Sequence, residues 1–405
     1  MTDHGPHAPT SDTAAAMHPR PPATDDGPHT FTAGAAAAAA VDPRTVEVYE
    51  RSAAAYRERR RSYAPERAAS FAALLPAGGV RIDLGCGPGH DLPHLGTPTV
   101  AVDAAPAMVA EARRHHRGTP GLVADLAALP LRHGSAAGVW ASKCLQHVER
   151  ARLPLALAGL HRALAPGGVL DLTVFRGDGE ARSGPDDDFP GRLFTWWQPD
   201  RLADVLVGAG FTVDEVSGTG VADRTGAPGK LCLRATRART LPDTVGAGMR
   251  LLVCGLNPSL YAADTGVGFG RPGNRFWPAA LAAGIASTDR SPDRALADHG
   301  VGMTDIVKRA TVAAAELTAG EYRDGLARVE RLVAWLQPGA VCFVGLAGWR
   351  AAVDRRAVPG VQPAALAGVP VYVMPSTSGL NARTPLAELA DHLRSAVRLA
   401  DGVRP

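Results

Sequence analysis

Lysine is almost absent from this chain. Lys143, Lys230 and Lys308 are the only lysines among its 43 basic residues, and arginine supplies the rest. Together with the abundant Ala, Gly and Pro, this bias reflects genome composition, so the arginine-rich run from Arg57 to Arg61 is interpreted as a solvated helix face. The net charge of +3 neither favours nor excludes a nucleic acid as partner, because a basic stripe can lie on a nearly neutral protein.

Cysteine is also scarce, and its spacing excludes one common type of metal site. No two of the 5 cysteines lie close enough in sequence to form a metal-binding pair, so we expect no metal. Their odd number, and the position of Cys254 and Cys342 in apolar runs, favour free, buried thiols and a reducing cytoplasm.

Long apolar runs are missing as well. No stretch approaches the ~20 residues of a membrane-spanning helix, so no membrane association is expected. The alanine-rich run 33–41 is similar to the core of an export signal, but the segment before it is acidic rather than basic, and we reject export. Residues 1–43 are rich in Pro, His, Thr, Asp and Ala and are predicted to be a disordered tail.

The remaining sequence is long enough for two domains. In residues 44–237 short apolar strands alternate with helices, which predicts a mostly parallel sheet, covered on both faces and finished by an antiparallel edge. A stretch of Arg, Thr, Pro and Gly at 236–248 marks a boundary, and the same rhythm restarts after it, so residues 238–405 are predicted to be a second, smaller α/β domain. Strands are predicted at 80–84, 99–102, 121–124, 138–141, 169–174, 211–216, 231–235, 250–254, 340–344 and 369–374, and helices at 106–116, 153–164, 199–208, 276–283, 320–336 and 385–398.

A glycine-rich turn, Asp83-Leu84-Gly85-Cys86-Gly87-Pro88-Gly89, follows the first strand. Such a turn lets the backbone pass close to a nucleotide, and by itself it fits a dinucleotide or an adenosylmethionine. Asp103 ends the second strand, where a carboxylate can bind both ribose hydroxyls, and Asp125 with Leu126 follows the third, a pair suited to adenine. Each aspartate also has a structural interpretation, Asp103 as a helix cap and Asp125 as a turn residue.

With Ala165-Pro166-Gly167-Gly168-Val169-Leu170 before the fifth strand, these residues resemble the small-molecule type of class I methyltransferase, which has a Rossmann-like sheet. The resemblance implies S-adenosyl-L-methionine as cofactor, and the methyl acceptor stays unknown, because methyl transfer depends on positioning and needs no fixed catalytic residue. His147 is a base or a structural histidine, and Trp196 and Trp197 line an acceptor pocket or belong to the core. The cofactor-binding residues implied are Asp83, Gly85, Gly87, Gly89, Asp103, Asp125 and Leu126.

Four short motifs mark the second domain. They are Gly255-Leu256-Asn257-Pro258-Ser259-Leu260, Phe269, Pro272-Gly273-Asn274-Arg275-Phe276-Trp277, and Met374-Pro375-Ser376-Thr377-Ser378-Gly379-Leu380-Asn381-Ala382-Arg383. Their order and spacing resemble the mismatch-specific uracil/thymine DNA glycosylases, members of the uracil-DNA glycosylase superfamily, which cut the bond between a base and its sugar. The resemblance implies base-excision repair, with double-stranded DNA containing G·U or G·T mismatches as the partner.

The same resemblance implies a role for each motif residue. Asn257 is the catalytic residue that holds the attacking water, Phe269 stacks on the flipped base, and Leu380, beside Gly379, is the wedge pushed into the vacated stack. Because an amide cannot take the proton of that water, a slow enzyme is expected. The remaining expectations are that Arg383 holds a phosphate or supports the wedge loop, that Asn274 shapes the base pocket, and that Asp305 contacts the base edge.

The sequence therefore predicts a cytoplasmic, bifunctional α/β enzyme with an N-terminal methyltransferase and a C-terminal DNA glycosylase. Two alternatives stay open. In one, the glycosylase-like half only binds nucleic acid or is inactive. In the other, both pockets have decayed and the protein is a non-enzymatic damage sensor.

Overall fold

The computed structural model describes residues 41–125, 129–218, 229–381 and 383–402. Residues 1–40 of the predicted tail lie outside them. The predicted end of that tail at residue 43 is too late, because Val41 forms a β-bridge with Val148 and the Asp42 carboxylate accepts a hydrogen bond from Thr45 N, which caps helix α1 (Pro43–Arg59). None of the described helices is long and apolar enough to cross a membrane.

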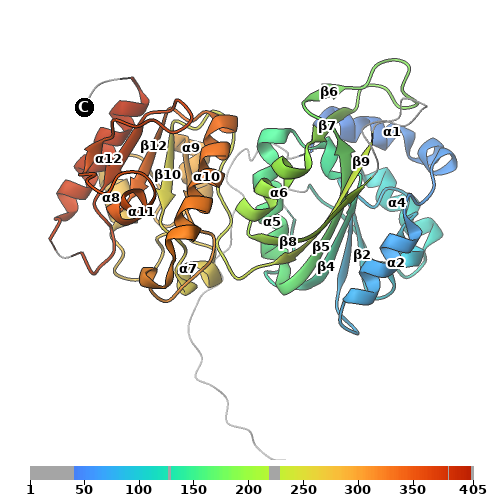
Figure 1. Cartoon of the computed structure of the whole chain (residues 1–405). Helices are drawn as coiled ribbons and strands as arrows, with labels where there is room; N and C mark the ends of the chain where they lie inside the picture. Colours follow the sequence, from blue (N-terminus) through green and yellow to red (C-terminus); the bar gives the residue numbers. More distant parts are fainter. Residues whose placement is uncertain (1–40, 126–128, 219–228, 382, 403–405) are drawn as a thin grey trace, which may run out of the picture. The chain divides into compact units, whose positions relative to one another are not determined.

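The first half of the chain forms a sheet in which β1 (Arg81–Leu84) is central, flanked by β2 (Thr99–Asp103) and β4 (Ala136–Ser142) (Figure 1). These strands pair in parallel. β3 (Gly121–Val123) continues the sheet beside β2, and β5 (Leu164–Arg176) continues it beside β4, both also in parallel. The predicted antiparallel end is confirmed, since β9 (Lys230–Arg237) pairs antiparallel with both β5 and β8 (Phe211–Gly218). The predictions missed β6 (Glu180–Arg182) and β7 (Leu193–Trp197), which extend the sheet beyond β5.

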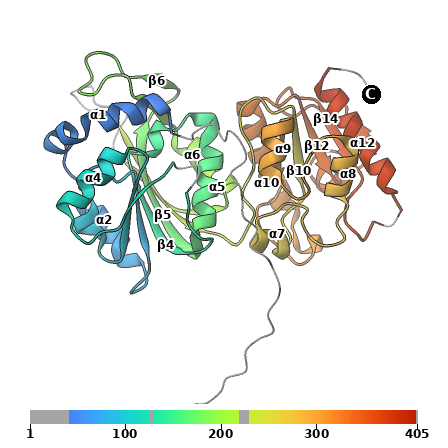
Figure 2. The same cartoon turned by 180° about the vertical axis from the view of Figure 1, so that it is seen from behind.

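Helices cover both faces of this sheet. α2 (Pro65–Leu74) and α4 (Pro106–His115) lie on one face, and α5 (Leu153–Ala163) and α6 (Pro199–Gly208) on the other, as the two opposite views show (Figures 1 and 2). The side chains of β4 alternate accordingly: Trp140 packs against Phe71 of α2, whereas Val139 and Ala141 pack in the cluster that includes α5. This two-sided burial explains the nearly continuous apolar character of the strand. The short helix α3 (Leu92–Leu95) follows the glycine-rich turn.

The second half forms a five-stranded sheet in the order β11 (Val301–Asp305), β10 (Leu251–Gly255), β12 (Ala340–Val344), β14 (Val371–Met374), β13 (Gly360–Val361). All neighbours are parallel except the β13–β14 pair. Along β10, Leu251 and Val253 pack with α8 (Phe276–Ala283) and α12 (Leu386–Ala400), and Leu252 and Cys254 with α10 (Ala319–Leu336) and α11 (Leu346–Ala352). This alternation is that of a strand buried on both faces. The short helices α7 (Leu260–Thr265) and α9 (Pro292–His299) complete the domain, and β11 was not predicted.

Candidate functional sites

The glycine-rich turn after β1 needs its glycines. Gly85, Gly87 and Gly89 have φ of 64°, 52° and 86°, a region that side chains other than glycine rarely adopt. A Cβ at Gly85 would collide with Cys144, which follows β4. A Cβ at Gly87 would lie 4.0 Å from the ring of Tyr56 in α1. The turn is therefore packed closely between the loop after β4 and the helix α1.

Asp103 ties the glycine-rich turn to the segment just before α4, and its predicted ribose contact stays a prediction. Its carboxylate accepts hydrogen bonds from Ala105 N, just before α4, and from Gly87 N in the glycine-rich turn, each at 2.9 Å. Burial raises the pKa of this carboxyl, and the two backbone N–H groups oppose the rise. Asp103 thus fixes the turn and still lines the cavity beside it.

Two further carboxylates lie near this turn, and each has an unused oxygen. Asp83 is 2% exposed, and its Oδ2 has no hydrogen-bond partner among the described residues. Asp91 accepts the indole N–H of Trp140 at 2.8 Å through Oδ2, whereas its Oδ1 also lacks a described partner. Burial raises the pKa of Asp83 well above its ordinary value, and the charges of Asp91 and Asp103 raise it further. A cationic ligand would relieve this repulsion, and the ammonium and sulfonium of S-adenosylmethionine fit that requirement.

A cavity of about 610 Å³ opens beside the turn. One wall is formed by α1, another by the turn and Asp103, and a third by the loop after β4. Its lining residues are Val41, Thr45, Val46, Tyr49, Tyr56, Gly85, Gly87, Asp103, Ala104, Ala105, Met108, Ser142, Lys143, Cys144 and His147. Asp125, half-buried, lies just beyond the carboxyl end of β3 and is not part of this lining. Leu126 lies outside the described residues. Neither Trp196 nor Trp197 lines the cavity, and Trp197 is fully buried in the core.

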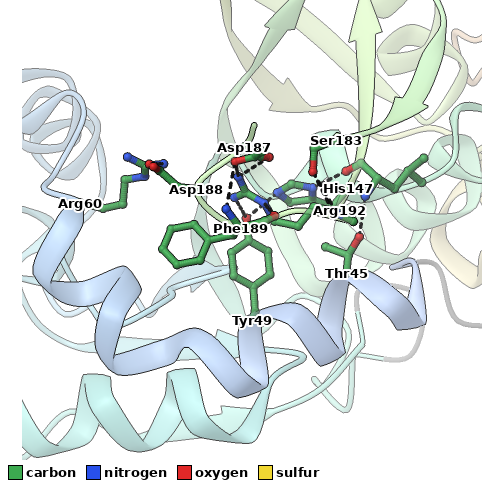
Figure 3. Close-up of polar contacts among 11 residues, drawn as sticks. Thr45, Tyr49, Arg60, His147, Ser183, Asp187, Asp188, Phe189 and Arg192 are labelled. Atoms are coloured by element: carbon green, nitrogen blue, oxygen red, sulfur yellow. Dashed lines mark hydrogen bonds and ion pairs between the residues drawn. The ribbon is translucent and has the colours of Figure 1, made fainter. Parts of the chain in front are cut away.

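A hydrogen-bonded chain fixes the wall formed by α1 (Figure 3). His147 Nδ1 donates to the carbonyl of Leu193 at 2.6 Å, so its Nε2 accepts the hydroxyl hydrogen of Tyr49 at 2.8 Å. Tyr49 Oη in turn accepts from Arg192 Nη1 at 2.9 Å, and Arg192 is also bound to both oxygens of Asp187. Burial lowers the pKa of His147 to about 4. Both ring nitrogens are therefore used and the ring is neutral, which favours the structural interpretation of this histidine.

The second candidate site begins where β10 ends. The Asn257 side-chain amide donates from Nδ2 to the carbonyl of Arg309 at 2.9 Å and to Thr311 Oγ1 at 2.8 Å. A carbonyl can only accept, so the NH₂ group must face Arg309. The Asn257 Oδ1 receives no donor from the described residues, and it stays available to accept a hydrogen bond from water.

Asp305 and Phe269 converge over Gly255. The parallel register places Asp305, the last residue of β11, opposite Gly255. A Cβ at Gly255 would collide with the Asp305 carboxylate and lie 3.3 Å from the ring of Phe269. Phe269 has a φ of 56°, and one face of its ring stacks on Phe276 at 4.3 Å between centroids. The absence of a side chain at Gly255 thus lets the Asp305 carboxylate and the Phe269 ring approach the end of β10 closely.

A buried ion cluster lies behind Asp305. Asp243 is 2% exposed and accepts hydrogen bonds from Lys308 Nζ, Arg328 Nη1 and Thr304 Oγ1 at 2.7–2.8 Å. Burial opposes ionisation of Asp243, but the charges of Arg328 and Lys308 hold its pKa below the ordinary value. Burial raises the pKa of Asp305 to about 6, against the charge of Lys308. The pKa values of the two aspartates are therefore shifted in opposite directions, down for Asp243 and up for Asp305.

The predicted wedge loop presents an uncovered leucine. Leu380 is 95% exposed, and a Cβ at Gly379 would lie 2.9 Å from the carbonyl oxygen of Gly273. Arg275 supports the loop, since its guanidinium donates to the carbonyls of Asn381 and Thr384. Arg383 is exposed and makes no hydrogen bond with the described residues, so Arg275 rather than Arg383 holds the loop there, and the phosphate contact of Arg383 stays a prediction. Asn274 Oδ1 accepts from Phe276 N at 2.9 Å and holds the first turn of α8.

Family models match one segment in each half of the chain. A family model for a methyltransferase domain matches residues 82–172, and a model of the uracil DNA glycosylase superfamily matches residues 242–398. The chain therefore carries a methyltransferase domain and a uracil DNA glycosylase superfamily domain, which confirms both resemblances at this level.

Several solved methyltransferases are similar to this chain. The 1,6-didemethyltoxoflavin-N1-methyltransferase of Burkholderia thailandensis is 22% identical, and the match covers 47% of this chain and 87% of that one with a TM-score of 0.37. An S-adenosylmethionine-dependent methyltransferase of Mesorhizobium loti is 23% identical over 42% of this chain and 96% of that one, with a TM-score of 0.34. Another, of Methanosarcina mazei, is 16% identical over 40% and 94%, with a TM-score of 0.37.

Proposed function

We propose that the C-terminal domain hydrolyses the N-glycosidic bond of uracil mispaired with guanine in double-stranded DNA, with thymine as a second substrate to be tested. The N-terminal domain, in the same proposal, transfers a methyl group from S-adenosyl-L-methionine. The observation that carries the glycosylase half is the fixed orientation of the Asn257 amide, two residues after the end of β10 at Gly255.

The first step of the argument concerns the attacking water. Breaking the bond between base and sugar passes through a cation-like sugar, so a correctly placed water matters more than a strong base. Asn257 is anchored through its NH₂ group by Arg309 and Thr311, and its Oδ1 can hold such a water by accepting one hydrogen. Because the amide cannot accept the proton, excision is expected to be slow.

The second step concerns the base. A flipped base is read by stacking and by hydrogen bonds to its Watson–Crick edge. One face of Phe269 is covered by Phe276, so a base can stack only on the other face. The ionised carboxylate of Asp305 can accept the N3–H of uracil or thymine, whereas cytosine presents an unprotonated N3 that would repel it. This pairing supports a preference for the deamination product over the normal base.

The third step concerns the duplex. Flipping a base costs a few kcal/mol of unstacking. Insertion of Leu380, which is 95% exposed in the free protein, would bury apolar surface worth about 2 kcal/mol and offset part of that cost. Arg275 holds the backbone of the loop, which lets the leucine enter the stack without collapse of the loop.

The cofactor proposal rests on the first cavity. Asp103 lines this cavity, and its carboxylate can accept ribose hydroxyls. Asp83 and Asp91 lie near the same turn, outside the lining, and each has an oxygen without a described partner that could accept the ammonium of the methionine end. When bound, S-adenosylmethionine supplies an activated methyl group on its sulfonium. The wall formed by α1 is fixed by the hydrogen bonds of Tyr49, His147 and Arg192, and a rigid wall of this kind supports a small molecule as acceptor.

The deciding experiment measures alkali-labile breaks in end-labelled DNA containing G·U, G·T or A·U pairs, or single-stranded uracil. Wild type is compared with Asn257→Ala and with Asp324→Asn, an exposed residue of α10 that serves as control. Breaks at G·U that vanish only in Asn257→Ala, with DNA binding retained, would support the proposal. Intact G·U duplex at high wild-type excess would refute the glycosylase half and leave a nucleic-acid-binding module at most.

A further inference from the structure

Lys143 lines the methyltransferase cavity, and its ammonium has no hydrogen-bond acceptor among the described residues. The residue is half-buried and lines the cavity together with Cys144 and Gly85. Among the described residues no oxygen atom accepts a hydrogen bond from its Nζ, which instead lies 4.7 Å from the centroid of the Tyr63 ring. A charge taken partly out of water gains from an opposite charge, and this half-buried ammonium has only an aromatic ring and like charges close to it.

The groups that face Lys143 make its charge more costly. Lys230, the first residue of β9, also lies over the ring of Tyr63, with its Nζ 3.7 Å from the centroid. Burial, together with the charges of Lys230 and Arg60 and against that of Asp91, lowers the pKa of Lys143 to about 8. Two of the three lysines of this chain thus meet at one ring. The third lysine, Lys308, forms an ion pair, because its Nζ lies 2.8 Å from the carboxylate of Asp243.

The backbone keeps Lys143 in this position. Its φ is 58°, in the left-handed region, and its N–H donates to the carbonyl of Thr173 in β5 at 2.9 Å. A long side chain in that conformation is strained, and strain of this kind gathers at binding and catalytic sites. Lys143 is thus a strained, unpaired cation that borders a cavity, and those features together indicate an anionic ligand.

The walls of the cavity narrow the chemistry of that ligand. Asp103 lines the side near the glycine-rich turn, and Asp83 and Asp91, which interact with it, lie near that turn outside the lining. This acidic side suits the cationic end of the cofactor and repels an anion. The rings of Tyr49 and Tyr56 and the side chain of Met108 give the rest of the lining an aromatic and apolar character. A single ammonium without an arginine fork matches one carboxylate better than a phosphate, which takes more donors.

This inference rests on the proposed methyltransferase function and names its acceptor class. We propose that the methyl acceptor is a small aromatic carboxylate, and that its carboxylate binds to Nζ of Lys143. Lys143 is thereby the residue that selects the acceptor, while the acidic side of the cavity holds the cofactor.

The test uses the full chain labelled with [ε-¹³C]lysine, which gives three resonances because the sequence holds Lys143, Lys230 and Lys308 only. Binding of S-adenosylhomocysteine is first measured by calorimetry. Benzoate is then titrated into that complex, with its neutral analogue benzamide as the control ligand. Benzoate, but not benzamide, is expected to shift the Lys143 resonance and raise the pKa of that lysine, with the Lys308 resonance unchanged.

Variants separate the side chain from the fold. Lys143→Met is expected to weaken benzoate binding at least about tenfold, the effect of one charge-assisted hydrogen bond, and Lys143→Arg to retain most of it. Lys230→Met is the matched control, because Lys230 stacks on the same ring without lining the cavity, and it is expected to bind benzoate nearly as wild type. All three should bind S-adenosylhomocysteine within about twofold of wild type, since Asp103 and the glycine-rich turn are unchanged.

Three outcomes would overturn the inference. If benzoate does not shift the Lys143 resonance in a protein that binds S-adenosylhomocysteine, the proposed acceptor class is refuted and the proposed methyltransferase function still stands. A Lys143 response to S-adenosylhomocysteine alone, with none to 5′-methylthioadenosine, would assign the lysine to the carboxylate of the cofactor. Failure to bind S-adenosylhomocysteine at all would refute the proposed function and this inference with it.

Discussion

Replacing Asp305 by asparagine is expected to make the glycosylase domain more stable and less active. The Asp305 carboxyl is 7% exposed, and burial raises its pKa from 3.8 to about 6. Asparagine has the same size and can still accept one hydrogen bond, but it does not ionise. Because only the ionised aspartate is a strong acceptor for the N3–H of a pyrimidine, activity and stability should change in opposite directions.

The magnitude follows from the pKa of Asp305. A rise from 3.8 to about 6 corresponds to about 3 kcal/mol. Because the folded pKa lies above the unfolded one, the stability of the domain falls as the pH rises between these two values and stays lower above them. Asp305→Asn should therefore raise the free energy of unfolding by up to ~3 kcal/mol at pH 7.5. Its loss of a charge-assisted hydrogen bond to the base should slow excision about tenfold.

The assay is single-turnover excision of uracil from a G·U duplex between pH 5 and pH 8, with urea unfolding measured in the same buffers. With a pKa of about 6, the ionised fraction of Asp305 rises about tenfold from pH 5 to pH 7, and the wild-type rate should rise with it. Asp305→Asn should show no such rise, and Asp324→Asn, exposed on α10, should follow wild type. A wild-type rate that stays flat across this range would refute base recognition by the ionised carboxylate.

Three other substitutions test separate parts of the molecule. Leu380→Ala should reduce uracil excision from duplex DNA about tenfold, since about 1.4 kcal/mol of apolar burial is lost, and should leave excision from single strands unchanged; an equal loss on both would exclude a wedge. Asp103→Ala should weaken S-adenosylhomocysteine binding at least about tenfold by calorimetry, because both its ribose contact and its bond to Gly87 N disappear; unchanged affinity would place the cofactor elsewhere. Asp243→Ala should destabilise the glycosylase domain by about 3–5 kcal/mol in urea unfolding, because it leaves the buried charges of Lys308 and Arg328 without their carboxylate; a change under about 1 kcal/mol would contradict that pairing.

The strands that the sequence predicted are those with local signals. β12 is predicted to the residue at 340–344, and β1 and β10 to within one residue at each end, because apolar runs bounded by glycine or proline mark buried parallel strands. β11 was missed because only Val301 and Met303 of its five residues are large and apolar. β7 was missed because Leu193–Trp197 contains no alternation of polar and apolar residues, and its place beside β5 depends on a long-range pairing.

The same distinction applies to the site residues. Asn257, Phe269 and Leu380 are recognised from motifs in which the residue itself carries the signal. Asp91 was not singled out, and Arg275 was named only within the Asn-Arg-Phe-Trp motif that was expected to shape the pocket. Their roles arise from contacts across the fold, with Trp140 and with the wedge loop respectively. The importance of Lys143 was equally hidden, since neither its left-handed backbone nor the lack of an acidic partner in the described part of the chain can be read from neighbouring residues.

The sites that could be predicted share a position in the fold. Asp83, Asp103 and Asp125 stand at or just beyond the carboxyl ends of β1, β2 and β3, and Asn257 and Asp305 stand in the same way on β10 and β11. In a parallel sheet these ends face one edge, where the loops are free to carry chemistry while the strands carry the core. A short polar motif directly after an apolar run is therefore a site signal that needs no knowledge of tertiary structure. Lys143 obeys the same rule, one residue after β4, and its position among the predicted ligand-binding residues is why an acceptor-binding role explains it better than a solvated surface charge.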